Sequence, residues 1–197
     1  MAAHAKLKVR PGGSSGASSG TDARGLRFGV AVAEFNDFVT DRLLEGALEG
    51  FAEAGVDKKQ LEIVKVPGSF ELPIAAKQMA ATGRFNALIC IGCVIRGETS
   101  HYDYVCSETA RGIQLAQLDT GVPVGFCVLT CDTKEQALAR AGGKDTNKGY
   151  AAAIGAIQMA RLARKFSGNA PRAKAATAAK PRGQRAAPRP KSAKRRR

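Results

Sequence analysis

Short apolar runs alternate with helical patterns along the middle of this 197-residue chain. The apolar runs contain few polar breaks, which is typical of strands that are covered on both faces. They predict strands at residues 26–33, 61–66, 87–95 and 124–130. The intervening segments predict helices near residues 39–51, 71–81, 101–118, 133–140 and 147–166. Strict alternation of strands and helices indicates right-handed βαβ units, and therefore an α/β fold with a parallel sheet.

Four strands of this length predict a three-layer αβα sandwich of the flavodoxin-like type, with a four-stranded parallel sheet and helices on both faces. Ligands of such sheets bind at the carboxyl ends of the strands. Functional side chains are therefore expected in the loops at residues 34–37, 67–71, 96–101 and 130–133.

The positive charge of the chain is concentrated at its two ends. The formal net charge is +14, yet residues 25–166 contain sixteen basic and sixteen acidic residues. We expect a flexible Gly/Ser-rich extension at residues 1–24, one folded domain at 25–166 and a disordered basic tail at 167–197. The tail contains eleven Lys and Arg residues and no acid. It either binds nucleic acid without sequence specificity or serves as a solubilising extension.

Five cysteines in a chain without a secretion signal predict reduced thiols and a cytoplasmic protein. The first residues are rich in Ser and basic side chains, which leaves an organelle transit peptide as an alternative. No run reaches the roughly 20 apolar residues that a membrane-spanning helix needs, so we expect no membrane association.

Metal ions and nucleotide cofactors are not expected. Cys90 and Cys93 match Cys-x-x-Cys, but residues three apart in a strand face opposite sides of the sheet and do not readily hold one ion. Cys127 and Cys131 have no histidine cluster beside them. No Gly-x-Gly-x-x-Gly follows the first predicted strand and the chain has no Walker loop, which argues against dinucleotide and nucleoside-triphosphate chemistry.

The loop after the third predicted strand contains the strongest candidate for chemistry. Ser100 and Asp103 have the spacing of a capping box, which would present backbone N–H groups and the positive end of the helix dipole to an anion. His101 falls in the first helical turn, where the dipole favours a neutral imidazole that exchanges protons near neutral pH. The alternative is an ordinary capped helix with a solvated histidine.

The segment that follows the second predicted strand is a weaker candidate. It begins with a Pro-Gly turn at residues 67–68, after which Ser69 is placed to cap a helix. Phe70 could form a flat wall, and Glu71 could accept hydrogen bonds from substrate hydroxyls or amines. The alternative is a well-capped helix whose first turn carries an acid that compensates the dipole.

Two other segments indicate a function only when they are considered together with the two segments described above. Phe35 lies where the first predicted strand ends, and could stack on a heteroaromatic ring or simply form the rim of the core. The loop at residues 140–149 places cations around a glycine turn, which suits an anionic substrate. The alternative for this loop is a solvated connection between two helices.

These segments together resemble the lumazine synthase family. The resemblance rests on Phe-Asn-Asp-Phe at 35–38, Val-Pro-Gly-Ser-Phe-Glu-Leu-Pro at 66–73, Gly-Cys-Val-Ile-Arg-Gly-Glu-Thr-Ser-His-Tyr-Asp-Tyr-Val at 92–105, Gly-Val-Pro-Val at 121–124, and the segment at 140–149. These motifs occur in the order and spacing of that family. The resemblance identifies residues 25–166 as a lumazine synthase-like catalytic domain and leaves out both ends of the chain.

The resemblance implies an enzyme of the transferase class without a metal or organic cofactor. The family condenses 5-amino-6-(D-ribitylamino)uracil with 3,4-dihydroxy-2-butanone 4-phosphate, which gives 6,7-dimethyl-8-ribityllumazine and phosphate in the penultimate step of riboflavin biosynthesis. Such chemistry needs positioning and modest proton transfer more than a strong nucleophile.

The resemblance also implies which residues bind the substrates within one subunit. Phe35 would stack on the pyrimidine, and Cys93, Val94 and Ile95 would line the pyrimidine pocket through backbone groups. Ser69, Phe70 and Glu71 would hold the ribityl chain. Glu98 and Thr99 would offer N–H groups to the phosphate. Cys93 stands where the family often has Thr, and this change is mild if only the backbone is used. The side chain of Glu98 should point away from the phosphate.

The implied catalytic residues come from two subunits. His101 would transfer protons. From a neighbouring subunit, Arg140 would hold the phosphate, Lys148 would assist, and the substrate-binding Phe126 would close the pocket. The family forms homo-oligomers: pentamers, sometimes stacked into decamers or closed into icosahedral capsids of sixty subunits.

Two other functions stay open at the level of the sequence. One is a binding module that sequesters a flavin-like ligand without turnover, and the other is a particle whose role lies in nucleic-acid binding by the basic tail. The joint presence of His101, Arg140 and Lys148 argues against the first, because a pure binder needs no such set.

Overall fold

The sheet of this protein has four parallel strands in the order β2–β1–β3–β4. The computed structural model describes residues 23–143 and 145–167. The strands are β1 (Phe28–Ala33), β2 (Leu61–Val66), β3 (Ala87–Ile95) and β4 (Val124–Cys131). The α-helices are α1 (Asp37–Glu53), α2 (Leu72–Ala81), α3 (His101–Thr120), α4 (Lys134–Ala141) and α5 (Lys148–Ser167), and the short 3-10 helices are η1 (Lys58–Gln60) and η2 (Ser69–Glu71).

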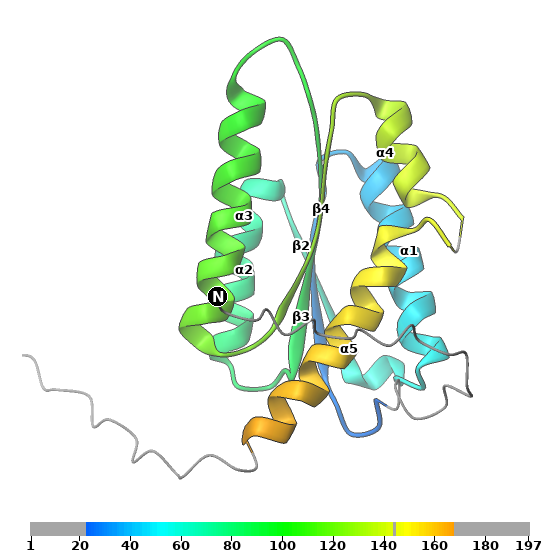
Figure 1. Ribbon diagram of the computed structural model, residues 1–197, viewed down its shortest axis with the longest axis vertical. Coiled ribbons are helices and arrows are strands. Elements are labelled where there is room, and N and C mark those ends of the chain that lie inside the picture. Colours follow the sequence, from blue (N-terminus) through cyan, green and yellow to red (C-terminus); the bar gives the residue numbers. More distant parts are fainter. Residues whose placement is uncertain (1–22, 144, 168–197) are drawn as a thin grey trace, which may run out of the picture.

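Helices cover both faces of this sheet. Helices α1, α4 and α5 pack on one face, and α2 and α3 pack on the other (Figure 1). Strands β1 and β3 are central, whereas β2 and β4 form the two edges. The prediction of an α/β, three-layer αβα sandwich with a four-stranded parallel sheet is therefore confirmed.

Alternate residues of the central strands enter two separate hydrophobic cores. On β3, Ile89, Ile91 and Cys93 pack on the side of α1, α4 and α5. Leu88 and Cys90 pack on the side of α2 and α3. Each large side chain that is fully buried contributes about 1.5–3 kcal/mol to folding. The two cysteines of the Cys-x-x-Cys pattern thus lie on opposite faces of the sheet, as predicted.

Most element boundaries agree with the sequence prediction to within a few residues. Strand β1 begins at Phe28 rather than Leu26, whose N–H donates instead to the carbonyl oxygen of Ala23 in a turn. Helix α2 begins at Leu72, because η2 occupies the preceding residues and Pro73 is tolerated only in the first helical turn. The short helix η1 was not predicted.

The extensions at both ends of the chain lie largely outside the described residues, so the predictions for them stay predictions. Of the expected N-terminal extension, residues 23 and 24 are described, and of the expected tail only residue 167. Within the described part, no helix combines the length and the apolar character that crossing a membrane would require.

The junction of α1, α4 and α5 is organised by a buried asparagine. Asn147 is only 8% exposed, and its Oδ1 accepts hydrogen bonds from the N–H groups of Gly149 (2.8 Å) and Tyr150 (3.2 Å), which caps α5. Its Nδ2 donates to the carbonyl oxygens of Arg42 in α1 (2.9 Å) and Ala141 at the end of α4 (3.0 Å). One side chain thereby joins three helices and fixes the start of α5.

Gly149 allows α5 to approach α1 this closely. A Cβ atom at this position would overlap with the backbone carbonyl oxygen of Leu43 in α1. Backbone atoms cannot move aside without shifting the helix. Gly155 lies in the same helix, but a Cβ atom there would meet no atom within 4 Å. The two glycines of α5 therefore differ in the space around them, although both are helical.

We expect Gly149→Ala to lower the melting temperature by several degrees, because overpacking against a helix backbone costs about 1–3 kcal/mol. Gly155→Ala is the matched control and should leave the melting temperature unchanged or raise it, because alanine favours helix by up to about 1 kcal/mol over glycine. Thermal unfolding of both variants at equal protein concentration measures the difference. Equal melting temperatures would show that α5 is free to shift away from α1.

Candidate active site

The carboxyl ends of β1 and β3 lie where the direction of the chain across the sheet reverses. From β1 the chain passes through α1 on one face to β2, whereas from β3 it passes through α3 on the other face to β4. Open α/β sheets bind ligands in the crevice at such a point. A pocket of about 810 Å³ lies there, which is within the usual range for a small-molecule site. Its lining consists of Phe35, Pro67, Gly68, Ser69, Phe70, Glu71, Cys93, Val94, Ile95, Gly97, Thr99, His101, Tyr102, Tyr104 and Val105.

The loop after β1 is held in place from two sides. Asn36 adopts the left-handed conformation (φ 63°), and its Nδ2 donates to the carbonyl oxygen of Cys93 at the end of β3 (2.9 Å). The N–H of Phe35 donates to the carbonyl oxygen of Pro67 after β2 (3.0 Å). The ring of Phe35 is nevertheless 71% exposed. A backbone fixed to two strands thus presents an exposed aromatic face to the pocket.

The segment after β2 packs tightly against β3. Ser69 is buried, and a Cβ atom on Gly92 of β3 would lie only 2.6 Å from its Oγ, so this approach requires glycine. The hydroxyl of Thr109 in α3 donates to the carbonyl oxygen of Ser69 (3.2 Å). Next to this anchor, Phe70 is 57% exposed and Glu71 also lines the pocket.

Ser69 and Ser100 were both expected to cap helices with their side chains, and both expectations were wrong. Gly68 precedes η2, and no side chain caps that turn. Ser100 has helical backbone angles and makes no side-chain capping bond, although its carbonyl oxygen accepts from the N–H of Asp103 (3.0 Å). The carboxylate of Asp103 pairs with Arg96 instead of reaching back to the helix end.

The turn between β3 and α3 is exposed throughout residues 96–101. Thr99 and His101 line the pocket, and the Oγ1 of Thr99 accepts a long hydrogen bond from the N–H of His101 (3.4 Å). Glu98 does not belong to the lining of the pocket. The start of α3 therefore brings an imidazole, backbone N–H groups and a hydroxyl to the edge of the cavity.

Cys93, which lines the pocket, and the buried Cys90 and Cys127 are unreactive. Burial raises the pKa of the Cys93 thiol to about 12, and it likewise raises the pKa of Cys90 and of Cys127 to about 12. These thiols are therefore protonated at neutral pH and are poor nucleophiles or metal ligands. Within the described residues, no group of three or more His, Cys, Asp or Glu side chains is arranged to hold a metal ion.

Besides Glu98, three other sequence-predicted residues lie outside this pocket in the single chain. Phe126 is half-exposed on the edge strand β4, and Arg140 is exposed in the last turn of α4, where its guanidinium donates to the carbonyl oxygen of Gln136 (2.9 Å). Lys148 is the exposed first residue of α5. Among the described residues that line the pocket, none is Lys or Arg.

Several structurally important residues were not singled out from the sequence. Asn36 and Gly92 stood in the quoted motifs without an assigned role, and so did Tyr102, which lines the pocket. The signals available were an asparagine directly before a helix and a glycine inside an apolar strand, which marks a close approach of another segment. Neither signal names the partner, because the partner lies 57 residues away for Asn36.

Comparisons with known proteins show the family of this chain. The profile of the 6,7-dimethyl-8-ribityllumazine synthase family matches residues 25–164. A 6,7-dimethyl-8-ribityllumazine synthase of Desulfatibacillum aliphaticivorans is 53% identical over 144 residues, which are 73% of this chain and 93% of that protein. Another, of Syntrophus aciditrophicus (strain SB), is 52% identical over 144 residues, which are 73% of this chain and 94% of that protein. The chain therefore belongs to the 6,7-dimethyl-8-ribityllumazine synthase family.

Proposed function

We propose that the pocket at the carboxyl ends of β1 and β3 is where this chain condenses 5-amino-6-(D-ribitylamino)uracil with 3,4-dihydroxy-2-butanone 4-phosphate in riboflavin biosynthesis. Membership in a family of transferases supports the reaction. The observation that carries the site is the meeting of Phe35, Glu71 and His101, from three separate loops, around one cavity.

The pyrimidine and its ribityl chain would occupy the part of the pocket between the loops after β1 and β2. The exposed ring of Phe35 suits stacking on a heteroaromatic ring. Ser69, Phe70 and Glu71 would lie along the ribityl chain, where the carboxylate of Glu71 accepts hydrogen bonds from hydroxyl groups. Because the side chain of Cys93 is buried in the core, this residue would contribute its backbone, as would its neighbours Val94 and Ile95.

The phosphate would bind at residues 97–100, at the amino end of α3. Backbone N–H groups and the helix dipole favour an anion there, and Thr99 adds a hydroxyl. Glu98 would offer only its N–H, in line with a side chain outside the pocket lining. His101 lies next to this turn and would move protons during imine formation, phosphate elimination and ring closure.

A second copy of the chain would complete the site. A phosphate carries about two negative charges near neutral pH, yet no Lys or Arg belongs to the described lining of the pocket. Arg140, Lys148 and Phe126 are exposed on other parts of the chain, where a neighbouring subunit would need them. We therefore propose that the active sites lie between subunits of a homo-oligomer. We further propose that this oligomer is a pentamer or a multiple of it, and that the protein is cytoplasmic.

The reaction itself is the first test, and it also separates the enzyme from a tail-dependent binder. Product formation, followed optically, and phosphate release should have equal rates. These rates should be the same for the full chain and for a chain that ends at Phe166. Tight pyrimidine binding without turnover would instead indicate a sequestering module. If the full chain forms product and phosphate at equal rates but the truncated chain forms neither, residues 167–197 belong to the enzyme.

The same pair of proteins tests the basic tail. We propose that its eleven cations bind nucleic acid without sequence specificity. The full chain should bind single strands with a log–log salt slope of up to about −8, and the truncated chain should lose this binding. Equal binding by both proteins would assign any nucleic-acid affinity to the folded domain.

We expect His101→Ala to slow turnover roughly tenfold or more, because a positioned proton-transfer group is lost. Assembly, measured by size, should stay intact, since the side chain belongs to neither hydrophobic core and the fold does not depend on it. Ser107→Ala removes another exposed polar side chain from α3 and should leave the rate unchanged. Unchanged kinetics of His101→Ala would remove this residue from its assigned role.

We expect Arg140→Ala to raise the KM for the butanone phosphate about tenfold or more and to leave the KM for the pyrimidine little changed, because a charge-assisted contact is lost. Lys77→Ala removes a cation that pairs with Asp119 and serves as control.

Mixing subunits shows whether Arg140 acts across an interface. Oligomers reassembled from equal amounts of His101→Ala and Arg140→Ala chains should recover about a quarter of the wild-type sites, because one site in four pairs an intact His101 with an intact Arg140. No recovery, with mixing verified by mass, would place both residues in the same subunit's site.

A further inference from the structure

Arg96 occupies an unusual position at the edge of the pocket. It is the first residue after β3, and both of its neighbours, Ile95 and Gly97, line the cavity. Arg96 itself is not part of that lining. Its backbone N–H donates to the carbonyl oxygen of Cys131 (2.9 Å) and so extends the pairing of β3 with β4. Its side chain therefore leaves a well-fixed backbone without being part of the pocket lining.

The guanidinium of Arg96 connects three points of the fold. Its Nε donates to the carboxylate of Asp132 in the turn after β4 (3.0 Å), and its Nη1 donates to the carboxylate of Asp103 in the first turn of α3 (3.2 Å). Its central carbon lies 4.0 Å from the ring centre of Tyr102, which lines the pocket. The hydrogen bond to Asp132 also raises the pKa of Arg96, so the group stays charged.

These contacts control the segment that would bind the phosphate. Residues 97–100 are exposed, so burial in the core does not hold their conformation. The segment begins at Arg96 and ends at the helical turn that contains Tyr102 and Asp103, so both of its ends are attached to the same side chain. A planar guanidinium with several donors suits this task, whereas a lysine ammonium could not reproduce the same fork and stacking contact.

We propose that Arg96 is a positioning residue for the phosphate subsite: it fixes the turn at residues 97–100 through Asp132, Asp103 and Tyr102, and does not bind the phosphate itself. The inference rests on the proposed binding of phosphate at this turn. An alternative role for Arg96 is direct attraction of the phosphate by its charge, and the two roles give opposite predictions for Asp132.

The test uses the full-length chain and measures the KM of both substrates and the inhibition constant of inorganic phosphate. We expect Arg96→Gln to raise the KM for the butanone phosphate and the phosphate inhibition constant about tenfold, with the KM for the pyrimidine within about twofold, because only the phosphate turn is released. Arg96→Lys should recover part of this loss, since it restores one charged contact.

Asp132→Asn decides between the two roles. Positioning requires the ion pair, so this variant should also raise the phosphate inhibition constant, by about threefold. Direct attraction predicts the reverse, because removal of the carboxylate would leave the charge of Arg96 less neutralised. A lower inhibition constant for Asp132→Asn would therefore overturn the proposal, and this variant keeps the test decisive even if Arg96→Gln does not fold.

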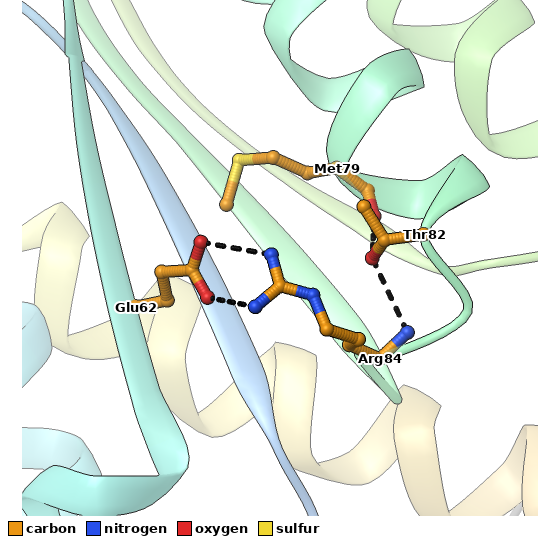
Figure 2. Close-up of polar contacts among 4 residues, drawn as sticks. All are labelled: Glu62, Met79, Thr82 and Arg84. Carbon is orange, nitrogen blue, oxygen red and sulfur yellow. Dashed lines mark hydrogen bonds and ion pairs between the residues drawn. The ribbon is translucent and has the colours of Figure 1, made fainter.

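Arg84 offers a matched control within the same chain. Its guanidinium forms a two-pronged ion pair with Glu62 on β2 (2.7 and 3.0 Å), as Figure 2 shows, and lies over the ring of Phe85 (5.1 Å). Its side chain is 50% exposed, close to the 44% of Arg96. Arg84 precedes β3 and thus lies at the opposite end of the strands from the pocket. Arg84→Gln should leave all three constants unchanged.

Arg140→Ala separates failure of this inference from failure of the phosphate assignment. A raised phosphate inhibition constant for Arg140→Ala, with wild-type values for Arg96→Gln, would overturn the role of Arg96 and leave the phosphate site in place. Wild-type values for both variants would overturn the phosphate assignment and the positioning role together.

Discussion

Strand β3 is buried on both faces along its first seven residues, and this constraint determines where the molecule can perform chemistry. In a strand that packs against helices on both faces, the side chains are buried and are not available to contact a substrate. Burial relaxes only at Val94 and Ile95, the last two residues of the strand. The pocket lies at this end, and its lining comes from the last residues of β3, the segments that follow β1 and β2, and the turn and first residues of α3 that follow β3.

A few polar and small residues convert this edge into a fixed shape. Asn36 attaches the loop after β1 to the carbonyl oxygen of Cys93, and Gly92 allows Ser69 to approach β3. Asn147 likewise bonds backbone groups, at the junction of α1, α4 and α5, where it fixes the start of α5. The two asparagines satisfy backbone groups that would otherwise be costly to bury, and Gly92 leaves room for the side chain of Ser69. Exposed rings and charges are then presented by a backbone that these contacts hold in place.

The sequence predicted the layers and the parallel sheet, because these follow from local periodicity. Of the four loops that it predicted to be functional, those after β1, β2 and β3 contribute to the pocket lining, whereas residues 130–133 do not. It predicted the side-chain caps of Ser69 and Ser100 wrongly, since a capping pattern reveals neither the packing of Ser69 against Gly92 nor the ion pair of Asp103 with Arg96. The bond of Asn36 joins residues 57 positions apart, and that of Asn147 to Arg42 joins residues 105 positions apart. Such contacts depend on the packed fold, so local patterns do not specify them.

Arg96 and Arg140 differ in their surroundings, which indicates different roles at the phosphate subsite. The Arg96 guanidinium lies beside the turn, but Asp132 and Asp103 already neutralise much of its charge. A cation that is held by two carboxylates gains little by approaching a phosphate, whereas it gains rigidity for the turn that it anchors. Arg140 has the opposite character, since it is exposed and lies outside the pocket of its own chain. Shape would then come from within one chain and the balancing charge from the next, so that the phosphate subsite would be complete only in the assembled protein.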